Sequence, residues 1–133
     1  MTDHRFDPIK DKTAEIIDFI LSAPEMPTDE NLLFKIRLSA EEATENIVQY
    51  AYKEGQGYIV VNIDRTPDNV LVIKLRDEGV PFNPLEQEDP DINLSAEERK
   101  IGGLGIFLCK QFMDRVVYTF EKGCNILTME KQL

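Results

Sequence analysis

The feature that most constrains this sequence is a change of hydrophobic period in the middle of the chain. Upstream, apolar residues recur at helical spacing from Leu32 to Ala51, which predicts one long amphipathic helix that ends near Gly55-Gln56-Gly57. Downstream, apolar and polar residues alternate over 58–64 and again over 70–77, which predicts a pair of strands joined by a turn. A chain with this change of period needs a sheet on which the helix can bury its apolar side.

The flanking segments extend the same pattern. Asp7-Pro8 is typical of a helix start, and apolar residues follow at helical spacing as far as Leu21. Another helix is predicted after the glycine-rich run at 102–105, followed by strands over 115–121 and 124–130. The predicted fold class is α/β (α+β): one domain over residues 1–133, a two-layer sandwich with helices on one face of a mostly antiparallel sheet.

Charge and composition narrow the classes of function. The formal net charge of −10 disfavours binding to nucleic acid or to an anionic membrane, which both need positive charge. No apolar run is long enough to span a bilayer and the start is unlike a signal peptide, so we expect a cytoplasmic protein. Cys109 and Cys124 show no metal-ligand spacing and are interpreted as reduced packing residues, and His4 is the only histidine.

A first group of polar residues lies on the long predicted helix. Glu42 and Asn46 are four positions apart, so they share one side of the helix, at the border of its apolar stripe. They could face a cleft between helix and sheet, where Glu can act as a general base and a carboxamide oxygen suits Mg²⁺. The alternative is a solvated helix edge that carries these residues by chance.

A second group ends the second strand of the predicted pair. By alternation, Asp77 shares a face with Leu71, Ile73 and Leu75, which is the face that should pack on the helices. A buried carboxylate needs a partner, such as the exocyclic amine of a ligand base, and Gly79 would let the backbone approach that ligand. The alternative is that Asp77 turns to solvent and starts a turn.

A third group opens the last helix. Gly102, Gly103 and Gly105 would free its first N–H groups to hold an anion, and Lys100 adds positive charge there. The preceding loop, about 80–101, is long enough to serve as a lid. The alternative is a flexible hinge, and the run matches neither the Rossmann nor the Walker A pattern.

In chain order, these groups resemble the motifs of the GHKL superfamily of ATPases and kinases, which share the Bergerat ATP-binding fold. The resemblance lies in Ala40–Asn46 with Tyr50-Ala51-Tyr52, in Ile73–Gly79, and in Gly102–Leu108. Within the superfamily, the sequence is most similar to the small bacterial anti-sigma-factor serine kinases of the RsbW and SpoIIAB type. The resemblance runs from the second helix to Leu133.

The resemblance implies that the chain binds ATP and Mg²⁺. Glu42 would be the base that activates the attacking hydroxyl, and Asn46 would bind Mg²⁺. Asp77 would accept a hydrogen bond from the adenine amino group, and Gly79 would lie near the ring.

The resemblance also implies the phosphate contacts and one further contact to the base. The residues around the phosphates would be Lys100, Gly102, Gly103, Leu104 and Gly105. The family's last hairpin often carries a polar contact to the base, which would fall here to Asn125 or Thr128.

The function implied is that of a serine/threonine protein kinase. It would phosphorylate a serine on an anti-sigma-factor antagonist of the STAS type, bind a sigma factor in alternation, and form a homodimer. Two other functions stay open: a nucleotide-dependent protein-binding module without kinase turnover, and the ATP-binding half of a histidine kinase. The last needs a phospho-accepting histidine on a separate helical domain, which His4 does not provide.

Overall fold

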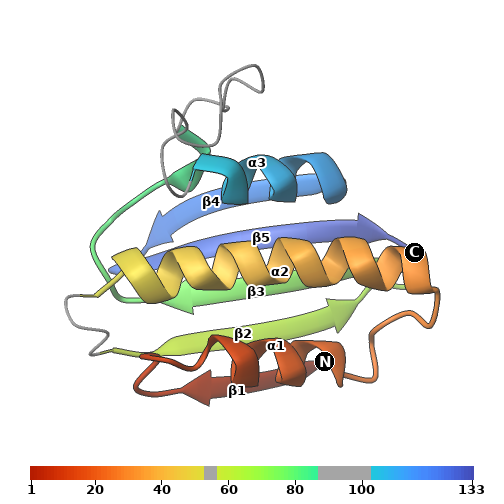
Figure 1. The fold of residues 1–133 in the computed structure, drawn as a ribbon, viewed down its shortest axis with the longest axis horizontal. Coiled ribbons are helices and arrows are strands. Elements are labelled where there is room, and N and C mark those ends of the chain that lie inside the picture. The colour runs from red at the N-terminus through yellow and green to blue at the C-terminus, as the bar shows by residue number, and fades with distance from the viewer. Residues whose placement is uncertain (53–56, 87–102) are drawn as a thin grey trace.

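The computed structural model describes residues 1–52, 57–86 and 103–133. Its elements are β1 (Thr2–Phe6), α1 (Thr13–Leu21), α2 (Glu30–Tyr50), β2 (Ile59–Arg65), β3 (Val70–Asp77), a short 3₁₀ helix η2 (Pro84–Glu86), α3 (Gly103–Phe112), β4 (Arg115–Glu121) and β5 (Cys124–Gln132). The strands form one sheet in the order β1-β2-β3-β5-β4, and every neighbouring pair is antiparallel. The helices lie together on one face of this sheet (Figure 1). The predicted two-layer sandwich is confirmed.

The core lies between the two layers and follows the predicted periods. Alternate residues of β2, β3 and β5 point toward the helices and are buried, namely Ile59, Val61, Ile63, Leu71, Ile73, Leu75, Leu127 and Met129. From α2, Ile36, Ala40 and Ala43 meet them. The small alanines let the middle of α2 approach the sheet closely, so the long helix becomes the central element of its layer.

The sequence predicted a helix as the first element, and this prediction is wrong because a strand precedes the first helix. Residues Thr2–Phe6 pair with β2 at the edge of the sheet. Their alternation is weak, since the three central residues of this strand are exposed and only its ends are partly buried. An edge strand with little apolar content carries no clear period-two signal.

The helix predicted to start at Asp7-Pro8 begins instead at Thr13. Asp11 has a φ of 59°, a left-handed conformation that a right-handed helix cannot contain. Ile9 is fully buried and its N–H donates to the carbonyl of Gly57 at 3.0 Å. The segment between β1 and α1 is therefore a turn, and its Ile9 side chain packs in the core.

The long helix ends at Tyr50, earlier than predicted. The carbonyl of Ala51 accepts a hydrogen bond at 2.8 Å from the N–H of Val80, which lies just beyond β3. This tertiary contact lies at the C-terminal end of the helix, and of the glycines proposed as its stop, Gly55 lies outside the described residues.

Two other expectations concern membranes and cysteines. In the described ranges, no helix has the length and apolar character needed to cross a membrane. Cys109 and Cys124 are both free thiols, as predicted. Burial raises the pKa of Cys109 to about 12, and its Sγ donates to the carbonyl of Ser39 at 3.1 Å, which fits a packing role.

Candidate functional site

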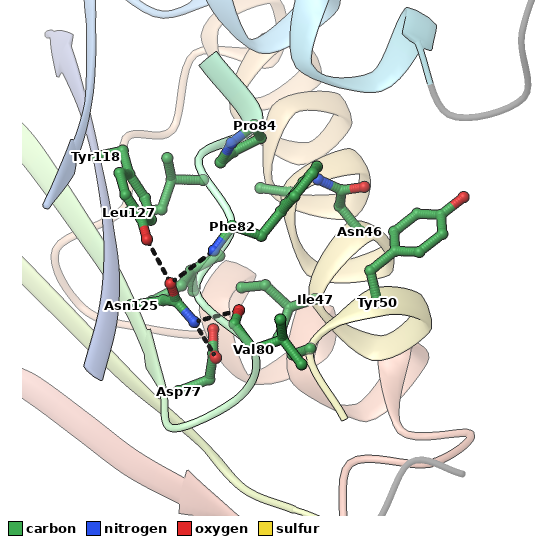
Figure 2. A pocket seen from close by; sticks show the side chains of 13 residues that line it. Asn46, Ile47, Tyr50, Asp77, Val80, Phe82, Pro84, Tyr118, Asn125 and Leu127 are labelled. Carbon is green, nitrogen blue, oxygen red and sulfur yellow. Dashed lines mark hydrogen bonds between the residues drawn. The ribbon is translucent and has the colours of Figure 1, made fainter. Parts of the chain in front are cut away.

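A pocket opens between the C-terminal half of α2 and the ends of β3, β4 and β5 (Figure 2). Its walls are mostly apolar, and a few polar groups converge on it. The residues that line it are Ala43, Asn46, Ile47, Tyr50, Ala51, Leu75, Asp77, Val80, Phe82, Pro84, Tyr118, Asn125 and Leu127. An apolar slot with a small number of placed polar groups suits a flat, partly polar ligand.

Asp77 is the only acidic residue that lines this pocket among the residues described. It is 3% exposed, so the prediction that it faces the core is confirmed and the solvent-facing alternative is wrong. Its Oδ1 accepts from the N–H of Gly79 at 2.8 Å and from Nδ2 of Asn125 at 2.9 Å. Burial raises the pKa of Asp77, and these two hydrogen bonds oppose the rise.

The other carboxylate oxygen of Asp77 has no such partner. In the described part of the chain, no group donates a hydrogen bond to Oδ2. An ionised carboxylate is a pure acceptor, so this oxygen can receive a hydrogen bond from a donor on a ligand. The slot therefore selects a ligand whose edge carries an N–H or amine group.

Asn125 lies opposite Asp77 in the register of β3 and β5. Its carboxamide reaches Asp77 and the main chain of residues 79–82 (Figure 2). Thr128, the alternative to Asn125, falls on the opposite face of the sheet, where it is paired with the exposed Lys74. Of the two, Asn125 is the residue at the pocket.

A close approach requires glycine at position 79, but the neighbour is the main chain of the protein itself and not a ligand. A Cβ built on Gly79 would overlap the carbonyl of Ala51 and lie 2.7 Å from the Ala51 Cβ. The turn after β3 is therefore pressed directly against the C-terminal end of α2. This contact sets how far Asp77 stands from the helix that carries Asn46.

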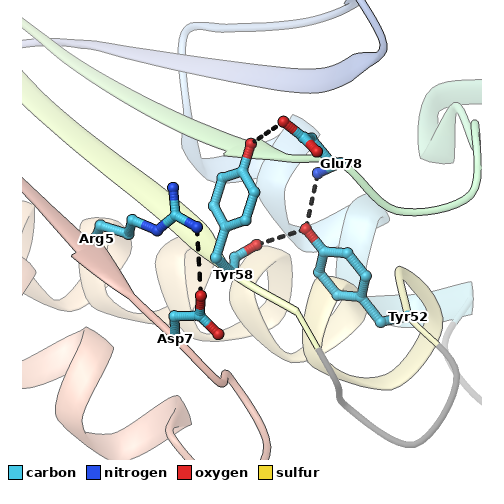
Figure 3. A network of polar contacts seen from close by, with 5 residues as sticks. All are labelled: Arg5, Asp7, Tyr52, Tyr58 and Glu78. Carbon is cyan, nitrogen blue, oxygen red and sulfur yellow. Dashed lines mark hydrogen bonds and ion pairs between the residues drawn. The ribbon is translucent and has the colours of Figure 1, made fainter.

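A network of tyrosines holds the same turn from the other side (Figure 3). The Tyr52 hydroxyl donates to the carbonyl of Tyr58 and accepts from the N–H of Glu78, both at 2.7 Å. The Tyr58 hydroxyl donates to the Glu78 carboxylate at 2.6 Å, and the Arg5 guanidinium lies 3.9 Å from the centre of the Tyr58 ring. The sequence predictions assigned Tyr52 no role, and only its place in the helix motif singled it out.

Asn46 and Glu42 take different positions although they share one side of α2. In the described part of the chain, only Asn46 of the two lines the pocket, and its carboxamide makes no hydrogen bond there. Glu42 lines a separate shallow hollow between α1 and α2. As described, the pocket extends along α2 only as far as Ala43, so the expectation that Glu42 shares a cleft with Asn46 stays a prediction. Glu42 stands one turn farther from Asp77 than Asn46 does.

The pKa of Glu42 is raised, first by burial and then by the charges of Glu41 and Glu45. These neighbours line the same hollow as Glu42 and have partners of their own. Glu41 pairs with Arg37 at 2.9 Å, and Glu45 accepts from the Thr13 hydroxyl at 2.8 Å. A carboxylate with a raised pKa is a stronger base, so Glu42 is suited to accept a proton.

The glycine motif opens α3, as predicted, with Gly103 as the first helical residue. Leu104 and Gly105 follow in the first turn, whereas Lys100 and Gly102 lie outside the described residues. The start of α3, the C-terminal end of α2 and the end of β3 lie at the same end of the molecule (Figure 1). Of the predicted lid at about 80–101, the structure describes residues 80–86.

That described part of the predicted lid supplies residues that the sequence did not identify. Val80, Phe82 and Pro84 line the pocket, and Tyr118 of β4 lines it from the sheet. No local pattern distinguishes these residues, because they reach the pocket only through the docking of the turn on α2 and the pairing of β4 with β5. Ile47 and Leu127, by contrast, follow from the periods of α2 and β5.

The described residues can also be compared with what a metal ion needs as ligands. Among the residues described, no group of three or more His, Cys, Asp or Glu side chains is arranged to hold one. Mg²⁺ in nucleotide sites does not need such a group, because substrate phosphates and water fill most of its coordination sphere. The Asn46 carboxamide, which lies at the pocket without a described hydrogen bond, fits the role of a single protein ligand.

Known proteins resemble this chain over most of its length. The family model of the histidine kinase-like ATPase domain matches residues 9–131. BtrW of Bordetella bronchiseptica, named a serine/threonine-protein kinase, is 29% identical over 98 residues, which are 74% of this chain and 69% of that protein. RsbW of Bacillus mycoides and RsbW of Bacillus cereus, named serine-protein kinases, are 33% and 34% identical over 96 residues, which are 69% of this chain.

These 96 residues are 59% of each Bacillus protein, so the match spans less than two thirds of their length. Among solved structures, the histidine kinase domain of a blue-light activated histidine kinase from Erythrobacter litoralis aligns with a TM-score of 0.60 and 15% identity. It covers 90% of this chain and 57% of its own, and it supports the predicted Bergerat type of fold. The order of motifs along the sequence and the match over residues 9–131 agree: the chain belongs to the histidine kinase-like ATPase domain family.

Proposed function

We propose that the pocket binds the adenine base of ATP and that the chain uses this ATP as a serine/threonine protein kinase. The observation that carries the first part is Asp77, a buried carboxylate with one bonded oxygen and one free oxygen in an apolar slot. The free acceptor matches the amino group of adenine and repels the carbonyl oxygen that guanine carries at the same ring position. The apolar walls supply the surface against which a base packs.

The phosphates would extend from this slot past Asn46 toward the start of α3. Unpaired N–H groups at a helix N-terminus favour an anion, and the glycines at 103 and 105 let phosphates approach the backbone. Asn46 would hold Mg²⁺, which neutralises phosphate charge when bound. Lys100 and Gly102 are proposed for the same phosphate contacts from their place in the motif.

Glu42 is proposed as the base that takes the proton of the attacking serine hydroxyl. It lies one helical turn beyond Asn46 along α2, and its charge acts on the Cys109 thiol of α3, the helix whose start would hold the phosphates. Its raised pKa makes this carboxylate a stronger base than an ordinary Glu. The names of the relatives BtrW and RsbW support the kinase assignment.

The substrate would be a serine of a STAS-type anti-sigma-factor antagonist, and a sigma factor would be the alternate partner. We also propose a homodimer. The exposed edge of β1 offers unpaired backbone groups that a second chain could cover. Light scattering on the purified chain tests the dimer, and co-purification with the antagonist or the sigma factor tests each partner separately.

Isothermal titration with ATP and Mg²⁺ tests the nucleotide site. The wild type should bind saturably, and Asp77→Asn should lower its affinity by about tenfold or more, because a charged hydrogen bond is lost. Asp64→Asn is the matched control, because this carboxylate is exposed on the sheet face away from the helices. An absence of ATP binding by a folded wild type would remove the proposal.

Transfer of labelled phosphate to the antagonist tests the kinase step. Glu42→Gln should bind ATP like the wild type and lose transfer. If Glu42→Gln transfers phosphate as fast as the wild type, Glu42 is not the base. If the wild type binds ATP and transfers nothing, the chain is a nucleotide-dependent protein-binding module instead.

A further inference from the structure

We infer that Asn125 is a positioning residue that orients the Asp77 carboxylate for recognition of the base, with Tyr118 fixing the orientation of Asn125 in turn. The inference rests on the proposed ATP site and goes beyond it, because it gives Asn125 an indirect role in place of a direct ligand contact.

The hydrogen-bonding capacity of Asn125 is already used within the protein. Its Oδ1 accepts from the Tyr118 hydroxyl and from the N–H of Phe82, the latter at 3.3 Å. Its Nδ2 donates to Asp77 at 2.9 Å, to the Val80 carbonyl at 3.1 Å and to the Gly79 carbonyl at 3.4 Å. A carboxamide has two N–H bonds and two lone pairs, so nothing remains for a ligand.

Phe82 and Tyr118 decide which end of this carboxamide faces Asp77. The N–H of Phe82 can only donate, and it shares its acceptor atom on Asn125 with the Tyr118 hydroxyl. The atom that accepts from this N–H must be the amide oxygen, which turns the NH₂ group toward Asp77. A reversed carboxamide would set its oxygen against the carboxylate and its NH₂ against the N–H of Phe82.

This orientation determines which carboxylate oxygen of Asp77 is left for a ligand. Asn125 and the N–H of Gly79 both bind Oδ1, so the carboxylate cannot rotate without breaking a buried hydrogen bond. Oδ2 is thereby held as the free acceptor. Without Asn125, the carboxylate would keep only the hydrogen bond from the Gly79 N–H, so it could rotate more easily and its preference for a base with an amino group would fall.

The test compares two nucleotides that differ only in the group that Asp77 would recognise. Purine riboside triphosphate is ATP without the 6-amino group, so the ratio of its Kd to that of ATP measures recognition of the amine. In Asn125→Leu this ratio should fall by about tenfold, the value of one charged hydrogen bond. Tyr118→Phe keeps the ring and frees the carboxamide, so it should lower the ratio by a smaller factor.

Two controls separate positioning from general damage. Thr128→Ala, on the same strand but on the opposite face, should leave the ratio unchanged. In the Asp77→Asn background, Asn125→Leu should have no further effect on the ratio, because the group that it positions is altered. Thermal melts show whether each variant is folded, and Tyr118→Phe carries the test if Asn125→Leu does not fold.

The outcomes distinguish this inference from the proposed function. If the wild type does not prefer ATP over purine riboside triphosphate, the adenine site itself is wrong. If the wild type prefers ATP and folded Asn125→Leu or Tyr118→Phe keeps the full ratio, the positioning role is wrong while the site stands. Weaker binding of both nucleotides by the same factor also overturns the inference, since it indicates a merely structural residue.

Discussion

The two ends of the candidate site are built in different ways. The base end, defined by Asp77, Gly79 and Asn125, is buried and tied by hydrogen bonds to β5, to the turn after β3 and to the end of α2. At the phosphate end, Asn46 and Glu42 project from one helix, and neither makes a hydrogen bond to the described part of the chain. The described residues therefore supply partners to the base end, whereas they supply none to Asn46 and Glu42 at the phosphate end.

This difference predicts how substitutions separate stability from binding. At the base end, a change should affect the free energy of unfolding and nucleotide affinity together. At the phosphate end, a change should affect Mg²⁺-dependent binding or phosphate transfer and leave stability unchanged. The following variants test the contrast.

Gly79→Ala should have the largest effect. Its new Cβ would overlap the carbonyl of Ala51, which is backbone and cannot move cheaply. We expect a loss of about 1–3 kcal/mol in the free energy of unfolding, measured by urea denaturation, with weaker ATP binding. Gly123→Ala is the control for backbone strain alone, because this glycine has a φ of 80° and open space around it. A variant at Gly79 as stable as the wild type would contradict the close packing.

Asn46→Ala should come next and affect only the phosphate end. The affinity for ATP in the presence of Mg²⁺ should fall by about tenfold or more, whereas affinity measured with EDTA should change little. The free energy of unfolding should stay within about 0.5 kcal/mol of the wild type. Asn62→Ala, on the face of the sheet away from the helices, is the matched control. An equal loss of affinity with and without Mg²⁺ would contradict a metal role for Asn46.

Tyr52→Phe should have a smaller effect, on both stability and base recognition. The variant removes the hydroxyl that joins Glu78 to Tyr58, and we expect a loss of about 1 kcal/mol, since water can reach Glu78. Tyr58→Phe is the control, because its hydroxyl donates to the exposed carboxylate of Glu78 and not to the main chain. If Tyr58→Phe destabilises the protein more than Tyr52→Phe, the link between α2 and the turn after β3 is not the important one.

The smallest effect concerns the pH dependence of phosphate transfer. Burial first, and then Glu41 and Glu45, raise the pKa of Glu42 above its ordinary value of 4.5. A base acts when deprotonated, so the rate should fall as the pH falls through this raised pKa. Removing both neighbouring charges in Glu41→Gln/Glu45→Gln should move the fall to lower pH, and added salt should weaken that difference. An unchanged pH–rate profile would mean that another group sets it.

The sequence predicted the layout of the fold because periodicity is a local property. The long stripe of α2 and the alternation in β2 and β3 each depend on residues a few positions apart. Alternation also placed Asp77 on the buried face, since a residue's face is set by its parity along the strand. The order of the three motifs along the chain then indicated the family.

The sequence did not predict β1, the turn at Asp11 or the end of α2. A solvated edge strand carries little apolar content, and a left-handed Asp has no fixed signature. The contact at the end of α2 is with Val80, which lies far along the chain. Each of these features involves a partner outside the local segment.

By itself, then, the sequence determined most of the elements, the buried faces of β2, β3 and β5, and some of the residues that line the pocket. Only the tertiary structure decided how those residues are used. Asp77, Asn125 and Tyr118 meet because β5 pairs with both β3 and β4 in one register. Local periods do not specify that register. The inference that Asn125 positions Asp77, and does not bind the ligand itself, therefore rests on the folded chain.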